Sequence, residues 1–445
     1  MRVRLDSVGC RLNIGEMEEL ALVLAGHGHR IVGPGDVADL FVFNTCAVTH
    51  VAARKSRKVL RQIRRDHPHA SIVATGCYAD LSAAEVERLG VDMVVGNRDK
   101  DQLADQLAVA GLLRDADPIG DADSTPFAAP HGRTRAFVKV QDGCDNRCTF
   151  CIVTVARGDS RSRPLETVIA QVRHLAQLGY REAVLTGVHL GSYGHDHDDR
   201  HGLEHLVAAI LDRTDIPRLR LSSLEPWDIR PELFDLWRDG RLQPHLHLPL
   251  QSGCDATLRR MSRRTSQAEF SALVAAARAV ISDLAVSTDV IVGFPGETDE
   301  EFEESIEFIE SMAFSRLHVF RYSPRAGTTA ASMSGQVDPS VAQRRSRRLH
   351  TLGADLETSF RCAMLGRKTE VLWESSESFD AGKRWSGLTG NYVRVVTDTG
   401  REIDLRNRAT VTELVDSLPG ALYGLCTATR GRPCEADPND QLVFS

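Results

Sequence analysis

Three cysteines stand close together in the middle of the chain, in the segment GCDNRCTFC that holds Cys144, Cys148 and Cys151. Three thiolates with this spacing can bind one corner of a 4Fe–4S cube and leave its fourth iron open to an added ligand. Structural zinc normally has four protein ligands, often as paired CxxC units. No further cysteine or histidine lies close to this triplet. The pattern therefore favours a three-cysteine iron–sulfur centre over zinc or over unrelated buried cysteines.

A second set of cysteines is spread along the first part of the chain. Cys10, Cys46 and Cys77 each follow a strand-like stretch: VRLDSV, DLFVFNT and ASIVATG. The carboxyl ends of parallel strands meet at one edge of a sheet, where ligand sites gather, and neighbouring strands lie about 4.8 Å apart. We therefore expect these cysteines to converge on one metal centre. Three small buried cysteines with no ligand remain the alternative.

Composition limits the class of protein and its compartment. The 445 residues carry a net charge of −7 and are 42% hydrophobic, which excludes a mainly disordered chain, a fibre and a disulfide mini-scaffold. No apolar run approaches the roughly 18 residues of a membrane span, and the start of the chain lacks a secretory signal. We expect a cytoplasmic protein with no membrane partner, so its ten cysteines favour ligation or catalysis over disulfides.

Basic residues gather in three runs of this acidic chain. The run over 54–65 has seven basic residues and no acidic one, and RRMSRR (259–264) and RRSRR (344–348) have four each. Each run alone is most often a solvated helix face. Together they make an anionic partner plausible without identifying it.

The surrounding pattern predicts an α/β protein. The first segment alternates strands and helices, which indicates a parallel sheet with helices on its faces. After a polar stretch, six further strands are predicted: AFVKVQ, EAVLTGV, RLRLSS, HLHLPLQ, VSTDVIVGF and LHVFRYS, most of them separated by helices such as 165–179, 203–214, 231–240, 267–281 and 299–312. Six βα units favour a partial barrel over a complete eight-fold one.

A small all-β module is predicted after a basic helix near 340–362. Its expected strands are TEVLWES, NYVRVVTD, REIDLRN, ATVTELVD and LYGLCTA. The predicted domains are 1–114 (α/β), 131–362 (barrel) and 366–430 (all-β), with a linker at 115–130 and a tail at 431–445.

These motifs resemble a known family. CxxxCxΦC after the first barrel strand is similar to the radical S-adenosylmethionine superfamily. GCRLN, NTCAVT, TGCYA and VVGN resemble the N-terminal domain of the methylthiotransferases, and LTGVHLGSYG, HLHLPLQSG, DVIVGFPGET and FRYSPRAGT continue the likeness through the barrel. The last module stands where that family carries its TRAM domain.

The resemblance implies two 4Fe–4S clusters and S-adenosylmethionine as cofactors. The cluster on Cys144, Cys148 and Cys151 would bind S-adenosylmethionine and cleave it to a 5′-deoxyadenosyl radical, with no side chain as acid or base. The cluster on the other three cysteines would carry sulfur, and a second S-adenosylmethionine would give the methyl group. Gly187, at the end of the second barrel strand, is expected to contact the cofactor. Less specific pocket candidates are Thr186, Ser222, Ser223, Glu225, Gln251, Ile291 and Gly293.

The family divides by substrate. The motifs are most similar to the branch that converts C2–H of N6-threonylcarbamoyladenosine at tRNA position 37 to C2–SCH3. The alternatives are N6-isopentenyladenosine in tRNA, whose branch shares HLPLQSG, and an aspartate of a small-subunit ribosomal protein. Thr154 and Val155 replace the Pro and Tyr usual in the family. Expected partners are tRNA, with contacts from Arg394, Arg406 and Arg408, and a one-electron donor such as flavodoxin or ferredoxin. The sequence does not identify the sulfur donor, and we expect a monomer.

Overall fold

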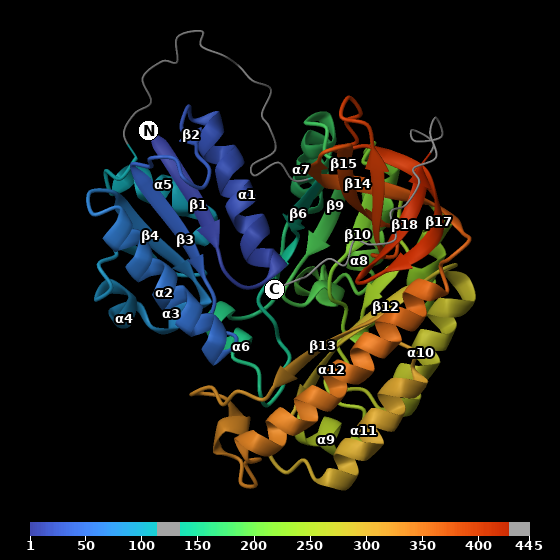
Figure 1. Cartoon of the computed structure of the whole chain (residues 1–445). Helices are drawn as coiled ribbons and strands as arrows, with labels where there is room; N and C mark the ends of the chain where they lie inside the picture. Colours follow the sequence, from blue (N-terminus) through green and yellow to red (C-terminus); the bar gives the residue numbers. More distant parts are fainter. Residues whose placement is uncertain (114–133, 427–445) are drawn as a thin grey trace. The chain divides into compact units, whose positions relative to one another are not determined.

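The computed structural model describes residues 1–113 and 134–426 and divides the chain into two compact units, 1–357 and 358–445 (Figure 1). The predicted linker (115–130) and tail (431–445) lie outside the described residues. In the part that is described, no helix is both long enough and apolar enough to cross a bilayer.

The first sheet is parallel throughout, in the order β2-β1-β3-β4-β5. The three strands predicted to precede cysteines are its central neighbours β1 (Arg2–Ser7), β3 (Leu40–Thr45) and β4 (Ser71–Gly76), and short strands β2 (Arg30–Ile31) and β5 (Met93–Val95) flank them. Separate apolar clusters cover its two faces, so β3 is buried along its whole length. Its helices are α1 (Arg11–Gly26), α2 (His50–Asp66), α3 (Cys77–Leu81), α4 (Ala83–Glu87) and α5 (Leu103–Val109).

Six parallel strands form the partial barrel that the sequence predicts. They are β6 (Arg135–Lys139), β9 (Glu182–Thr186), β10 (Arg218–Leu221), β11 (His245–His247), β12 (Ala285–Val292) and β13 (Arg316–Arg321). Two three-stranded sheets, β10-β9-β6 and β11-β12-β13, are joined by a parallel bridge between Ser223 and His247. The large apolar core lies between these strands and the outer helices α7 (Leu165–Gln177), α8 (Gly202–Arg213), α10 (Gln267–Val280) and α11 (Asp299–Ser311).

One predicted helix has a different form. Residues Pro231–Arg238 make a 3₁₀ helix, not the α-helix expected over 231–240. Leu233 and Phe234 are buried, and Leu236 and Trp237, three residues later, pack against the same core. A spacing of three matches the period of a 3₁₀ helix, so the core contacts select that form.

Helix α1 of the first sheet packs beside β6 of the barrel (Figure 1). A side chain at Gly15 would come within 2.7 Å of the Phe137 carbonyl oxygen, so this approach needs glycine. The Glu18 carboxylate accepts the Phe137 N–H at 3.0 Å. These contacts bring the start of α1, which follows Cys10, to the side of the barrel.

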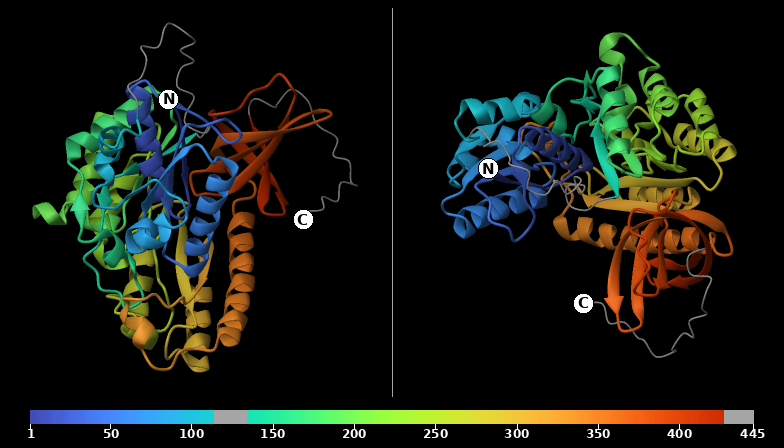
Figure 2. Two further views of the ribbon diagram at one scale, coloured as in Figure 1. Left: turned by 90° about the vertical axis from the view of Figure 1, so that its left-hand side faces the viewer. Right: turned by 90° about the horizontal axis from the view of Figure 1, so that it is seen from above.

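The second unit contains a closed five-stranded barrel, drawn in red in Figure 2. Its strands are β14 (Lys368–Phe379), β15 (Gly382–Thr389), β16 (Arg394–Thr399), β17 (Ala409–Leu418) and β18 (Ala421–Cys426), and α12 (Pro339–Cys362) leads into it. Strand β15, which contributes the buried Trp385, was not expected from the sequence. The expected strand 401–407 is absent, because Leu405 fills the core from a turn region without a strand partner.

The barrel interior contains a charged pair that makes folding depend on pH. Burial opposes ionisation of Glu182, but Arg220 and Arg218 lower its pKa to about 2. A carboxylate with a depressed pKa stabilises the fold above its unfolded pKa, about 4.3, and this contribution is lost as pH falls toward 2.

We predict that Glu182→Gln lowers the free energy of unfolding at pH 7 by about 3 kcal/mol, because two buried guanidinium groups lose their carboxylate. Urea denaturation between pH 7 and pH 3 should show a shallower pH dependence than the wild type. The control Glu166→Gln changes an exposed partner of Arg213 and should leave both properties nearly unchanged. If the unfolding free energy of the Glu182 variant depended on pH as steeply as that of the wild type, Glu182 would not be the titrating group.

Candidate functional site

Cys10, Cys46 and Cys77 lie together at the carboxyl ends of adjacent strands β1, β3 and β4. Cys10 caps α1, and Cys77 begins α3. A Cβ at Gly9 would lie 2.7 Å from the Cys46 Sγ, which shows how closely the first loop approaches the second. The structure thus brings together the three cysteines that the sequence places tens of residues apart.

We call this first set the sheet cysteines, and the protein around them favours the neutral thiol form of Cys46 and Cys10. Burial raises the pKa of the Cys46 thiol to about 11 and also raises the pKa of Cys10. The neighbouring sheet cysteines raise both values further. Such thiols ionise only when a cation compensates the charge, as a bound metal does.

Cys144, Cys148 and Cys151, the loop cysteines, lie between β7 (Gln141–Asp142) and α6 (Val153–Arg157). The loop is fixed by Thr149, whose N–H and hydroxyl donate to the Met261 and Arg260 carbonyls at 3.1 and 2.9 Å. The Val153 N–H donates to the Cys151 Sγ at 3.4 Å. Burial raises the pKa of Cys151 to about 12, so this thiol also requires a cation to become anionic.

Arg263 supplies a fixed positive charge beside Cys148. Its Nη1 lies 3.8 Å from the Cys148 Sγ, and its Nη2 donates to Glu225 at 2.6 Å. The guanidinium also stacks over Trp227 at 4.4 Å from the ring centre. Although burial raises the pKa of Cys148, Arg263 works against that rise. The sequence missed this residue because Arg263 belongs to a basic run expected on the surface, and the structure buries it.

Gly187 lies at the end of β9, against the side chain that orders the start of the cysteine loop. A Cβ at Gly187 would approach the Gln141 Oε1 to 2.9 Å. The Gln141 amide donates to the Gly143 carbonyl at 2.8 Å, and its oxygen accepts the His189 N–H at 2.8 Å. Gly143 itself has φ +73°, and a Cβ there would clash with the Asp159 carbonyl. A side chain at Gly187 would therefore displace Gln141, which orders the start of the cysteine loop.

His189, which the sequence did not single out, borders this loop. Its Nε2 lies 2.5 Å from Asp228, and Asn146 contacts its ring. Burial lowers the pKa of His189, but the interactions with Asp228 and Cys144 outweigh this and raise it to about 10. An imidazolium at this position adds a second positive group beside the loop cysteines.

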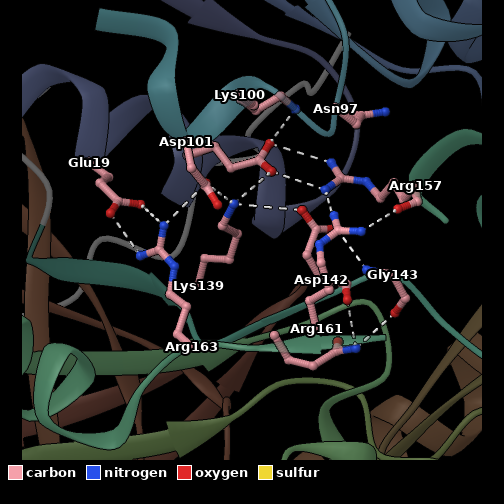
Figure 3. Close-up of polar contacts among 12 residues, drawn as sticks. Glu19, Asn97, Lys100, Asp101, Lys139, Asp142, Gly143, Arg157, Arg161 and Arg163 are labelled. Carbon is pink, nitrogen blue, oxygen red and sulfur yellow. Dashed lines mark hydrogen bonds and ion pairs between the residues drawn. The ribbon is translucent and has the colours of Figure 1, made fainter. Parts of the chain in front are cut away.

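A buried ion network joins the two cysteine sets (Figure 3). Arg157 donates to Asn13, Glu16 and Asp142 at 3.0, 3.0 and 2.8 Å. The Asn13 Oδ1 also lies 3.5 Å from the Cys10 Sγ, and Asp142 accepts the N–H of Gly143, the residue before Cys144. One side chain thus connects the loops of Cys10 and Cys144.

Two lysines complete the network around Glu16. Lys100 donates to Glu16 at 2.8 Å, and Lys139 lies 3.7 Å from the same carboxylate. Although burial opposes ionisation, these cations and Arg157 hold the pKa of Glu16 well below its usual range. Sequence patterns did not single out the charged residues of this network, because isolated charged residues on separate elements carry no spacing signal.

The donor sets fit iron–sulfur clusters. Each set consists of three unoxidised thiols: Cys46 and Cys77 are buried, the loop cysteines are half-buried and Cys10 is exposed. The loop set also has positive groups beside it. Phe150, Ile291, Met261 and Phe294 form an apolar patch next to the loop set. By contrast, the free cysteines Cys254, Cys362 and Cys426 belong to neither set.

Comparisons with known proteins show which families the chain is similar to. The profile of the Radical SAM superfamily matches residues 138–309, and that of the Uncharacterized protein family UPF0004 matches 2–96. A threonylcarbamoyladenosine tRNA methylthiotransferase MtaB from Bacillus subtilis is 37% identical over 409 residues, covering 88% of this chain and 90% of its own. A tRNA-2-methylthio-N(6)-dimethylallyladenosine synthase from a Thermoanaerobacter species is 34% identical over 402 residues, covering 87% and 85%.

Among solved structures, the radical S-adenosylmethionine methyltransferase TsrM from Kitasatospora setae has a similar fold. The TM-score is 0.53 at 16% identity, over 74% of this chain and 77% of that one. At this identity the likeness concerns the fold alone.

We predict that Arg157→Met lowers the free energy of unfolding by about 3 kcal/mol, because Glu16 and Asp142 lose a buried cationic partner. Iron reconstituted into the purified variant should fall for both cysteine sets, since both loops lose their shared support. Arg65→Met, on an exposed ion pair of α2, is the control and should behave as wild type. Full iron loading in a destabilised Arg157 variant would show that the network supports the fold but not the cysteine loops.

Proposed function

The chain belongs to the radical S-adenosylmethionine tRNA methylthiotransferases, and we propose that its substrate is N6-threonylcarbamoyladenosine at tRNA position 37, where C2–H becomes C2–SCH3. The observation that carries the chemistry is the pair of cysteine triplets, joined through Arg157 within one compact unit. Relatives named for this substrate, among them one from Thermotoga maritima at 37% identity over 380 residues, support the choice of nucleoside.

The enzyme uses S-adenosylmethionine and 4Fe–4S clusters, as radical S-adenosylmethionine enzymes of this family do. When bound, they supply one-electron cleavage of S-adenosylmethionine, hydrogen abstraction from an unactivated C–H bond, and sulfur. We assign one cluster to the loop cysteines and the other to the sheet cysteines. The loop cysteines would leave one iron open to S-adenosylmethionine, because only three thiolates stand on the loop.

Residues around the loop cysteines are suited to hold and shield an anionic centre. Arg263 and His189 place positive charge beside the thiolates and so stabilise their ionised form. Phe150 and Ile291 exclude water from this side of the loop. Gly187 and Gln141 keep the backbone at the end of β9 close to the cysteine loop. We propose that this backbone contacts S-adenosylmethionine.

Some residues of the basic runs form ion pairs within the protein, and others are exposed to solvent. Arg260, Arg345 and Arg348 pair with acidic residues of α11 or its cap, and Arg64 pairs with Asp92. In contrast, Arg54, Lys55, Lys58 and Arg61 of α2 are exposed. We propose that this α2 face, together with exposed Arg394, Arg406 and Arg408 of the second unit, binds tRNA phosphates.

The second candidate substrate is N6-isopentenyladenosine in tRNA. Relatives named for the dimethylallyl nucleoside and the HLPLQSG segment favour it. Both candidates require the same clusters and a one-electron donor such as flavodoxin or ferredoxin. Both also fit the cytoplasmic location predicted from the sequence.

The test of substrate and cluster assignment is mass spectrometry of tRNA nucleosides from a deletion strain. Wild-type protein should restore 2-methylthio-N6-threonylcarbamoyladenosine, whereas Cys148→Ala should not. Purified Cys46→Ala should still cleave S-adenosylmethionine but form no methylthio product, with about four irons fewer per chain. Cys362→Ala, on an exposed second-unit cysteine, should match the wild type. Recovery of only the isopentenyl analogue would contradict our choice of nucleoside.

Binding of tRNA should weaken steeply with salt, because each phosphate contact releases a counterion. We expect the Lys58→Gln/Arg61→Gln double variant to lower tRNA affinity and reduce the salt slope by about 2. Arg213→Gln/Arg238→Gln removes the same charge from exposed, acid-paired positions and should retain the wild-type slope. Filter binding from 50 to 300 mM salt measures the affinity for tRNA and its dependence on salt. If the Lys58→Gln/Arg61→Gln variant has the same slope as the wild type, the α2 face is excluded as a binding surface.

A further inference from the structure

A polar cluster on the inner face of the barrel is not used by the chemistry described above. His247, Asp289 and His318 belong to the adjacent strands β11, β12 and β13, and one ligand atom from each lies within 4.8 Å of the others. The His247 Nε2 stands 3.3 Å from Asp289. The rings of His247 and His318 are 5.5 Å apart.

Strand alternation shows that the cluster faces the barrel interior. On β12, Val286 and Val290 pack against the outer helices, so Ser287 and Asp289 point to the opposite side. On β13, Leu317 packs against that core, which places His318 on the inner face beside Asp289, its register partner. The side chains of His247 and Asp289 remain 12% and 26% exposed, so a bound group can reach them.

The same face leads directly to the loop cysteines. Ile291 follows Asp289 by two residues, about 6.6 Å along the strand. It packs against the same apolar cluster as Phe150, which stands between Cys148 and Cys151. The inner face of β12 is therefore apolar at Ile291, beside the cysteine loop, and polar at Asp289, two residues earlier.

Internal hydrogen bonds hold the histidines in fixed orientations. The Ser287 hydroxyl lies 2.9 Å from the His247 Nδ1 and 3.0 Å from the His245 Nε2. The Nε2 of His247 is consequently directed toward Asp289. A rigid set of donors and acceptors discriminates strongly between ligands that can pair with it and ligands that cannot.

We propose that Asp289 and His318, with His247 holding the Asp289 carboxylate, recognise the threonylcarbamoyl group of the substrate and select it over an isopentenyl group. Resting on the proposed function, this assignment names its specificity determinants. A ring N–H of His318 suits a carboxylate or carbonyl oxygen of the substituent, and Asp289 suits its hydroxyl or carbamoyl N–H. An isopentenyl group would desolvate these polar side chains without pairing with them, which is costly.

The test uses the reconstituted holoenzyme and an equimolar mixture of two anticodon stem–loops, one with each N6 substituent. We expect His318→Leu to shift the product ratio about 10- to 100-fold toward the isopentenyl product, from loss of a polar contact to the substituent. His318→Gln, which keeps hydrogen bonding, should recover part of the ratio. His205→Leu, on an exposed histidine paired with Asp199, should keep the wild-type ratio.

The test separates failure of this inference from failure of the proposed function. An unchanged ratio, or equal loss of both products, in His318→Leu would overturn the inference while leaving the proposed function in place. Wild-type enzyme that modifies only the isopentenyl stem–loop would overturn the proposed function itself. Zinc or manganese bound at one per chain beyond the cluster iron, and lost in His318→Leu, would show that the cluster is a metal site and would also overturn the inference.

Discussion

The relative placement of the two cysteine sets depends on one buried interaction, that of Arg157 with Glu16. Both side chains are almost wholly removed from solvent, so each needs the other to remain charged. Arg157 also reaches Asn13 beside Cys10 and Asp142 before Cys144. A shift of either loop would separate charges in a medium of low dielectric, so the network resists changes in the distance between the two centres.

Charge balance explains why the network can be buried. Its cations are Lys100, Lys139 and Arg157, and its anions are Glu16, Asp142 and the partly exposed Asp101. The members come from both the first sheet and the barrel. Apolar residues of the same volume would hold the two parts together without fixing their angle, whereas directional ion pairs specify one arrangement. Such specificity is valuable where two metal centres must act on one substrate atom.

The features that follow from strand periodicity could be predicted from the sequence. Those that depend on which side chains the tertiary fold buries could not. Cys10, Cys46 and Cys77 could be placed together because strand periodicity and the geometry of parallel sheets determine where strand ends meet. Arg157 and Arg263 could not be found, since an arginine on a short helix or in a basic run has the same local pattern whether it is exposed or buried. Residues 231–238 were assigned the wrong helix type because core spacing, not propensity, selected the 3₁₀ form.

In the assignment that we propose, the inner face of β12 serves both the cofactor and the substrate. Its alternation places Ser287, Asp289 and Ile291 on the interior side, in the order polar, charged, apolar toward the cysteine loop. An apolar end limits water where reactive species form, and a polar end offers partners to a substituent with hydrogen-bonding groups. A modified adenine bound along this strand would therefore be oriented by the contrast between its ring and its substituent. The same contrast disfavours a substrate whose substituent is apolar.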